Sequence, residues 1–277
     1  DAVLVLHHTP SSASVWDPDH LIAHIALGTC VENIALQAER SGHRTEVVAS
    51  PLPGVPELAA AIRVIMNGGS GSDVHELADL IGKRCTDRTL RPSEPSLLPG
   101  VKRSMEAIRA IPGCEGHLLE DRSLMQELGG ICGEVEKLRV LNPIGHREFF
   151  QHELRWTTGE AERTRDGLDI ATLEMRESDV VGLRIASDPA TMALVDQWQA
   201  GKGFERFSQL ALDAATAVVL VSVEGNEPKD RLLGGRAVER FWLAANKASL
   251  SVHPISAPIF LAHAARVGGP GIRPKEI

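Results

Sequence analysis

Cysteines are scarce in this sequence, and none has the spacing that would give it a structural role. The chain has four cysteines among 277 residues, and no two of them form a CxxC pair. This usage fits reduced thiols in the cytosol better than a disulfide framework. We therefore expect a cytoplasmic protein with four free thiols, at Cys30, Cys85, Cys114 and Cys132.

Long apolar runs and basic clusters are also missing. No run approaches the roughly 18 apolar residues of a membrane helix, and the opening "DAVLVLHHTP" is too short for a signal peptide and carries two histidines. The net charge of -8 comes from 37 acidic and 29 basic residues spread along the chain. The sequence predicts neither a membrane nor a nucleic-acid partner.

Several motifs of known chemistry are absent or incomplete. The sequence has no GxGxxG or Walker loop, and "GGSGS" lacks the last glycine of a G-x-S-x-G elbow, so we interpret it as a linker. "HRE" at 146–148 is not followed by the P-C-x-x-C of zinc deaminases. His20 and His24 stand at i and i+4 without a third ligand of suitable spacing, which favours a surface pair. We expect no metal site and no catalytic side-chain triad.

One element of the sequence occurs twice. "LGTCVENIALQAERSGHRTEVVASP" at 27–51 has a near relative in "GGRAVERFWLAANKASLSVHPISAP" at 234–258. At one constant offset, Gly28 matches Gly235 and Glu32 matches Glu239, among six identities over 24 positions. Both copies predict an apolar helix, a polar break, a short β-branched run and a proline. Two ordinary helix-strand units that happen to look alike are the alternative.

Hydrophobic periodicity along the chain predicts an α+β fold. The apolar content of 43% allows a substantial core. Residues 21–40 have helical periodicity, 44–51 suits a strand, and "PELAAAIRVIM" suits a helix or a strand. A Gly/Ser-rich break at 67–82 divides the chain. Beyond it, helices and strands alternate without a regular βαβ rhythm, "ATAVVLVSVEG" is the clearest buried strand, and 145–169 is polar and predicted to be irregular.

Three short stretches offer groups that could bind an anion. "TPSS" at 9–12 is a proline-set turn with two hydroxyls, although such stretches are more often only turns. In "RCTDR" an extended backbone would place Arg84, Thr86 and Arg88 on one side, where two guanidiniums and a hydroxyl suit a phosphate. A solvated charged strand is the simpler explanation of that pattern. The third stretch, "GIRPKEI", places Arg273 before a proline.

Together these stretches resemble the nitroreductase-like flavoprotein family. In that family an R-x-[ST]-x-R segment and an arginine before a late proline hold the FMN phosphate, and a P-S-S turn covers the flavin ring. "ERFWLAANKASLSVHPISAP" is also similar to the family, in which amides after the P-I step approach flavin N5. The resemblance implies phosphate contacts from Arg84, Thr86, Arg88 and Arg273, and ring contacts from Pro10, Ser11, Ser12, Ser256 and Ala257.

The resemblance also explains the repeat. Residues 81–277 have the order and length of one nitroreductase unit, whereas 1–80 look like a shortened first unit. The chain would then fold as an internal pseudo-dimer, with a mixed central sheet flanked by helices and one flavin site. "ELRWT" and "TRDGLDIATLE" look closer still to the Acg-like branch and to nitroreductase-like halves of proteins with a ThiF-type adenylating domain. A ThiF-type domain in the same protein is therefore a possible partner.

The function implied is an FMN-dependent oxidoreductase that takes electrons from NAD(P)H and passes them to a nitroaromatic, quinone or similar small-molecule acceptor. One departure favours an alternative. The family continues its P-S-S turn with an asparagine and a glutamine, whereas this chain reads "PSSASVWDPD", so those contacts are lost or the residues are absent from the sequence. The alternative is a non-catalytic protein that binds or sequesters FMN, or a flavin-binding module of a ThiF-type protein, with 145–169 as a lid and Trp156 over the flavin.

Overall fold

The fold is known from a computed structural model, which describes residues 2–9, 13–52, 54–55, 57–66, 76–269 and 272. It is an α+β structure, as the sequence predicts. The first part of the chain contains β1 (Ala2–His7), α1 (Leu21–Arg40), β2 (Arg44–Ala49) and β3 (Leu58–Ile65). The ambiguous stretch after residue 56 is thus a strand. The Gly/Ser-rich segment at 67–75 lies outside the described residues.

The second part of the chain is mostly helical. Its helices are α3 (Leu98–Met105), α4 (Arg122–Leu141), α5 (Pro143–Arg147), α6 (Thr158–Thr164), α7 (Glu177–Ala186), α8 (Pro189–Gln197), α9 (Lys202–Ala214), α10 (Pro228–Lys247) and α11 (Ala257–Val267). Its strands are β4 (Cys114–Leu119), β5 (Leu154–Arg155), β6 (Leu168–Asp169) and β7 (Val218–Val223). Local signals explain several boundaries. The side chain of Asp121 accepts from the Leu124 amide and starts α4, while Glu227 and Asp230 form a capping box at the start of α10.

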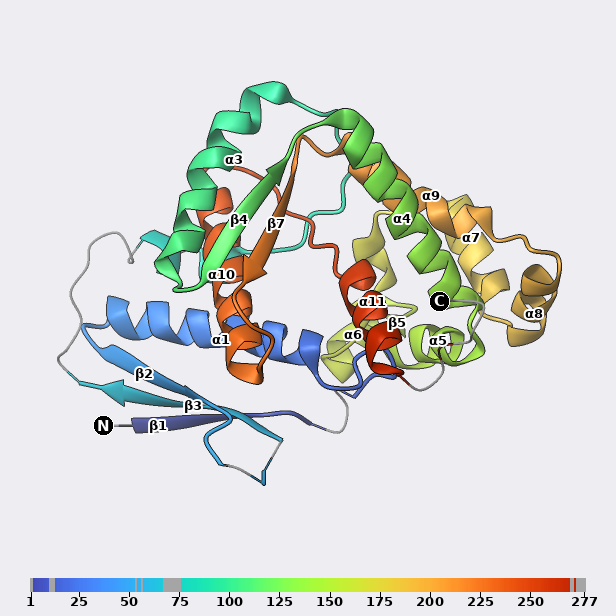
Figure 1. Ribbon diagram of the computed structural model, residues 1–277. Helices are drawn as coiled ribbons and strands as arrows, with labels where there is room; N and C mark the ends of the chain where they lie inside the picture. Colours follow the sequence, from blue (N-terminus) through green and yellow to red (C-terminus); the bar gives the residue numbers. More distant parts are fainter. Residues whose placement is uncertain are drawn as a thin grey trace.

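The strands form three small sheets rather than the one mixed central sheet that was expected. The described strands pair as β1-β3-β2 and β4-β7, both antiparallel, and as the short parallel pair β5-β6. Two helices separate the larger sheets: α1 packs on the first sheet and α10 on the second, and the two helices cross between them (Figure 1). Because helices fill the space between the sheets, the strands cannot join into one sheet.

The repeated helix is the best-defined correspondence in the fold. At the offset that aligns Gly28 with Gly235, α1 (Leu21–Arg40) and α10 (Pro228–Lys247) coincide at both ends, and each has 20 residues. The strand predicted to follow the second copy does not form. Residues 251–256 form no strand, whereas the matching stretch of the first copy forms β2.

α1 is the one described helix whose length and composition would also suit a membrane span, with a mean hydropathy of 1.3 over its apolar window. The sequence of α1 is therefore more apolar than predicted, because no apolar run of the length of a membrane helix was expected. Val31 and Leu36 of α1 are fully buried, against the first sheet and against Ala78 and Leu243 respectively. Packing inside the protein accounts for the apolar face of this helix.

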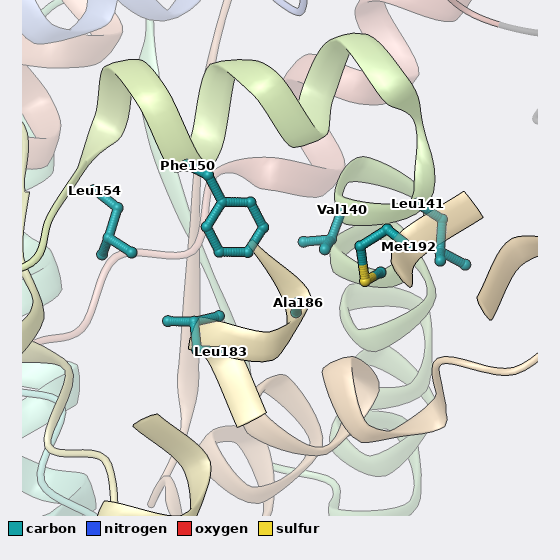
Figure 2. Packing of buried hydrophobic residues seen from close by; sticks show 7 residues of the cluster. All are labelled: Val140, Leu141, Phe150, Leu154, Leu183, Ala186 and Met192. Atoms are coloured by element: carbon teal, nitrogen blue, oxygen red, sulfur yellow. The ribbon is translucent and has the colours of Figure 1, made fainter. Parts of the chain in front are cut away.

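The helical part has a core of its own (Figure 2). Its buried members are Val140, Leu141, Phe150, Leu154, Leu183, Ala186 and Met192. The prediction of an irregular segment at 145–169 is wrong, because this stretch contains α5, a π-helical turn (Glu148–Glu153), β5, α6 and β6. Phe150 and Leu154 are 7% and 2% exposed, so apolar burial fixes the segment despite its polar composition.

β7 differs from its prediction as a buried strand. It pairs with β4, but Leu220 is 55% exposed, because only one face of the two-stranded sheet packs against the body of the protein. Val219, Val221 and Val223 point to the packed face, around Ile108 and Ala237. The apolar run therefore serves a strand buried on one side.

Candidate cofactor site

The structure brings together two of the segments singled out in the sequence. Residues 85–94 form neither a helix nor a strand, and they contact the segment that follows α10. The amide of Asp87 donates to the carbonyl of Val252 at 3.1 Å, and the Ser251 hydroxyl donates to the Asp87 carboxylate at 2.7 Å. This hydroxyl, with the Thr89 amide and Arg91, holds the pKa of Asp87 far below its usual range. The contacts lock Arg88 close to the segment that carries Ser256 and Ala257.

Arg84 turns toward α10. Its Nε lies 3.0 Å from Oε1 of Glu239, a residue with no exposed surface, although the N–H is not aligned for a regular hydrogen bond. The guanidinium also lies over the Trp242 ring, 4.3 Å from its centroid. Burial raises the pKa of Glu239, and the charge of Arg84 opposes this effect. The positive charge of Arg84 is thus engaged by a buried carboxylate.

Arg88 has a different environment. Its guanidinium donates to the carbonyl of Thr172 at 3.3 Å, and within the described chain it forms no ion pair with a carboxylate. Partial burial lowers its pKa. His253 lies near enough that Arg88 adds to the lowering of its pKa, which is due first to desolvation. Thr86 is half-buried between Arg84 and Arg88. This part of the site has a surplus of positive charge.

Ser256 and Ala257 stand at the start of α11. Ser256 is the N-cap residue, but its side chain does not cap the helix, and Ala257 is buried at 7% exposure. Within the described chain, no acceptor is assigned to the amides of these two residues. A helix N-terminus with open amides favours negative charge nearby. This geometry is compatible with the role that the sequence resemblance implies.

Pro10, Ser11, Ser12 and Arg273 lie outside the described residues. The residues after the expected turn are placed: Ser14 and the backbone of Val15 bond to Glu148, whose pKa is raised by burial. Trp16 is 3% exposed and packs against Gly145, where a Cβ would lie 2.7 Å from its ring. The chain around the turn is thus anchored on α5 and the π-helical turn.

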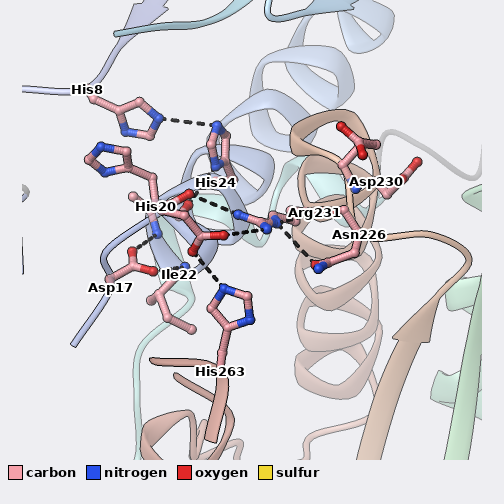
Figure 3. Close-up of polar contacts among 12 residues, drawn as sticks. His8, Asp17, His20, Ile22, His24, Asn226, Asp230, Arg231 and His263 are labelled. Atoms are coloured by element: carbon pink, nitrogen blue, oxygen red, sulfur yellow. Dashed lines mark hydrogen bonds and ion pairs between the residues drawn. The ribbon is translucent and has the colours of Figure 1, made fainter. Parts of the chain in front are cut away.

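A partly buried polar junction around His8, Asp19, His20 and His24 was not predicted (Figure 3). The rings of His8 and His20 stack with centroids 4.6 Å apart, and Nε2 of His8 lies 3.4 Å from Nε2 of His24. His24 is 5% exposed, so the expectation of a surface pair at His20 and His24 is wrong. His8, which directly follows β1, contacts both rings. Burial, first of all, lowers the pKa of both His8 and His24. Among the described residues, no group of three or more potential ligands has the arrangement needed for a metal.

Asp19 links this junction to two distant helices. Its carboxylate accepts from Arg231 of α10 at 2.8 Å and from His263 of α11 at 2.7 Å (Figure 3). Arg231 and His263 are buried, at 7% and 5% exposure. Desolvation of Asp19 raises its pKa, but the bonds to Arg231 and His263 outweigh it and leave the pKa below the usual value. The spacing of these residues, 212 and 244 positions from Asp19, gave no signal in the sequence.

Two buried glutamates were present in the sequence repeat but were not recognised as a site. Glu32 and Glu239 occupy matching positions of α1 and α10, and both have no exposed surface. Glu32 pairs with Arg236 at 2.8 Å and, through its other oxygen, with Arg240. The repeat did contain a signal for them: a glutamate occurs at the same position in both copies of an otherwise apolar helix. Because charges are buried only when they are paired, such a glutamate indicates a buried ion pair.

Other candidates have structural roles. Trp156, proposed as a flavin cover, stacks on Phe150 with centroids 6.2 Å apart and lies under Arg184. Arg155 of "ELRWT" is 9% exposed and bonds to Asp166 at 2.7 Å, which ties β5 to the loop before β6. Of the four free cysteines, Cys30 and Cys85 are exposed and Cys114 and Cys132 are buried.

Comparison with known proteins gives one relative and no family. No protein-family model matches the chain. A Mycobacterium tuberculosis (strain CDC 1551 / Oshkosh) protein, described as "Uncharacterized protein MT1398", is 30% identical over 153 residues, which cover 55% of this chain and 21% of the relative. The chain therefore spans about a fifth of the length of the curated relative it matches.

Proposed function

We propose that this chain is an FMN-dependent NAD(P)H oxidoreductase of nitroreductase type that folds as an internal pseudo-dimer. The observation that carries the proposal is the meeting of the "RCTDR" segment with the segment that leads into α11, joined by the Asp87 contacts to Ser251 and Val252. These segments are separated by more than 150 residues in the sequence. Both were assigned to one flavin site from the sequence resemblance.

The packing of α1 on α10 supports the pseudo-dimer. A Cβ on Gly28 would lie 2.3 Å from the carbonyl oxygen of Leu232, and a Cβ on Gly235 would lie 2.0 Å from that of Ile25. In the repeat, Gly28 matches Gly235 and Ile25 matches Leu232. Each helix therefore contacts its counterpart through the same position, which is the reciprocal pattern of a two-fold interface.

The residues of this site fit the anionic end of FMN. Arg88 is partly buried without a carboxylate partner in the described chain, and the start of α11 offers the amides of Ser256 and Ala257. When bound, FMN would supply the chemistry, because it takes up electrons from NAD(P)H and passes them to an acceptor such as a nitroaromatic or a quinone. The protein would hold the phosphate, orient the ring and limit access of water. No side chain needs to act as a catalytic acid.

A second candidate function is a flavin-binding module without turnover. It is favoured by the engagement of Arg84 with Glu239, which leaves fewer cations for the ligand than the family pattern implies, and by the small share of the relative that the chain covers. In this case the chain would store FMN or serve another domain, of which a ThiF-type adenylating domain is the candidate.

The absorption spectrum of the purified protein distinguishes these functions. It is recorded before and after anaerobic addition of NADPH, and again after FMN is added to any apoprotein. A band near 450 nm (roughly, as for protein-bound flavins) that bleaches with NADPH supports the oxidoreductase. A band that persists with both NADPH and NADH supports the module. No band after reconstitution with FMN contradicts both.

A further inference from the structure

Arg84 and Arg88 form a matched pair in the sequence, yet the structure gives them opposite environments. Arg84 contacts Glu239, which has no exposed surface, and lies 4.3 Å from the centroid of the Trp242 ring. Its own side chain is 28% exposed. Arg88 contacts a carbonyl oxygen, that of Thr172, and among the residues that the structure describes no carboxylate offsets its burial. Within this part of the chain, Arg84 is paired with a buried carboxylate, whereas Arg88 is not.

We propose that Arg84 is a positioning residue that fastens the "RCTDR" segment to α10, and that Arg88 is the side chain that contacts the phosphate of the ligand. This assignment rests on the proposed FMN site and differs from the family resemblance, which gives both arginines the same role. A phosphomonoester needs donors that are not already saturated by an anion. Releasing Arg84 toward a phosphate would leave Glu239 buried without its cation, which is strongly unfavourable.

The position of Glu239 explains why the segment is fastened there. Glu239 lies on α10 at the position that matches Glu32 of α1. Glu32 receives two arginines from α10 itself, Arg236 and Arg240. The matching positions of α1 are Thr29 and Asn33, which carry no charge, so α1 supplies no cation for Glu239. Arg84 of the "RCTDR" segment supplies this cation instead, and the contact holds the segment beside α10.

A thermodynamic cycle tests the role of Arg84. Arg84→Met alone leaves Glu239 unpaired and is expected to lower Tm. Glu239→Gln in the same chain removes the buried charge and is expected to recover most of the loss, because removal of both partners of a buried pair is often nearly neutral. Arg84→Lys, which keeps the charge, covers the case in which Arg84→Met does not fold. Losses that simply add in the double variant would overturn the positioning role.

Ligand binding tests the role of Arg88. Dissociation constants for FMN and for riboflavin, which lacks the phosphate, are measured by quenching of flavin fluorescence on each variant. Arg88→Met is expected to weaken FMN at least about tenfold, the effect of one charged hydrogen bond, with riboflavin affinity and Tm unchanged. Arg84→Met/Glu239→Gln is expected to keep the wild-type ratio of the two constants. Lys83→Met, which removes an exposed cation directly before the segment, is the matched control.

The outcomes separate this inference from the proposed function. Selective loss of FMN in Arg84→Met/Glu239→Gln, at wild-type Tm, would assign Arg84 to the phosphate and overturn the inference. If Arg88→Met leaves the ratio of the dissociation constants for FMN and riboflavin unchanged, the assignment of Arg88 to the phosphate is overturned. If the wild type binds neither flavin, the proposed function and the role of Arg88 both fail. In that case the coupling of Arg84 to Glu239 is tested by the unfolding temperatures alone.

Discussion

Glu32 and Glu239 hold the same position in two copies of one helix, and both are fully buried, but they are neutralised in different ways. Glu32 is paired by two arginines of the facing helix, whereas Glu239 is paired by Arg84, from an extended segment outside the helix pair. The comparison teaches that the helix crossing is symmetric in shape and asymmetric in charge. The asymmetry appears on the side where the proposed cofactor site lies.

The glycines at the crossing test the symmetric part of this comparison. Gly28→Ala and Gly235→Ala each place a Cβ within 2.3 Å of a backbone oxygen, so the helices must separate. We expect each change to lower the free energy of unfolding by about 3 kcal/mol or more, the upper range for overpacking, as measured by urea denaturation. Gly130→Ala, on α4 with no atom within 4 Å of the new Cβ, is the control and should be neutral or slightly stabilising. Tolerance of one crossing alanine but not the other would contradict a reciprocal interface.

The two glutamates test the asymmetric part. Glu32→Gln leaves Arg236 and Arg240 without a carboxylate, and we expect a loss of about 3–5 kcal/mol, as for broken buried pairs. Glu239→Gln should cost less, about 1–2 kcal/mol, because the carboxyl already has a raised pKa and Arg84 can reach solvent. Both values come from the same denaturation experiment. Equal losses of unfolding free energy in the two variants would show that the different partners of Glu32 and Glu239 do not change how much each pair stabilises the fold.

Asp19 offers a way to make the two halves more alike. Its match in the repeat is Asn226, so Asp19→Asn gives the first half the residue that the second half already has. The change removes the negative charge that Arg231 and His263 share, and we expect a loss of about 1–3 kcal/mol. Glu115→Gln, at an exposed acidic residue of β4, is the control and should leave the stability nearly unchanged. A stability unchanged by Asp19→Asn would mean that the junction does not hold α11 in place.

Acid should weaken the half that contains the histidines. The pKa values of His8 and His24 are lowered from 6.5, so the unfolded chain binds protons more readily, and stability falls as pH drops below about 6.5. Asp17 opposes this lowering at His8, while His20 adds to it at both rings and Arg231 at His24. Tm measured between pH 7.5 and 5.5 should fall less in His24→Gln than in the wild type. His7→Gln, an exposed neighbour on β1, should leave the slope unchanged.

Much of the local structure could be predicted from sequence. Helical periodicity placed α1, and β-branched runs placed β2 and β7, because these signals depend on neighbours within one element. The repeat also identified Gly28 with Gly235 and Glu32 with Glu239 before their contacts were known. The prediction was wrong where burial is decided by distant elements: at 145–169, at the exposed face of β7 and at the histidines taken for a surface pair.

The sequence by itself determined the α+β class, the extent of α1 and the correspondence between the two long helices. Only the tertiary structure decided which cation meets which carboxylate. Arg84 and Arg88 share one motif, but their roles depend on the position of Glu239, more than 150 residues away, relative to the extended segment. Charge pairing acts over a few ångströms in space, and the chain brings those atoms together only when it packs.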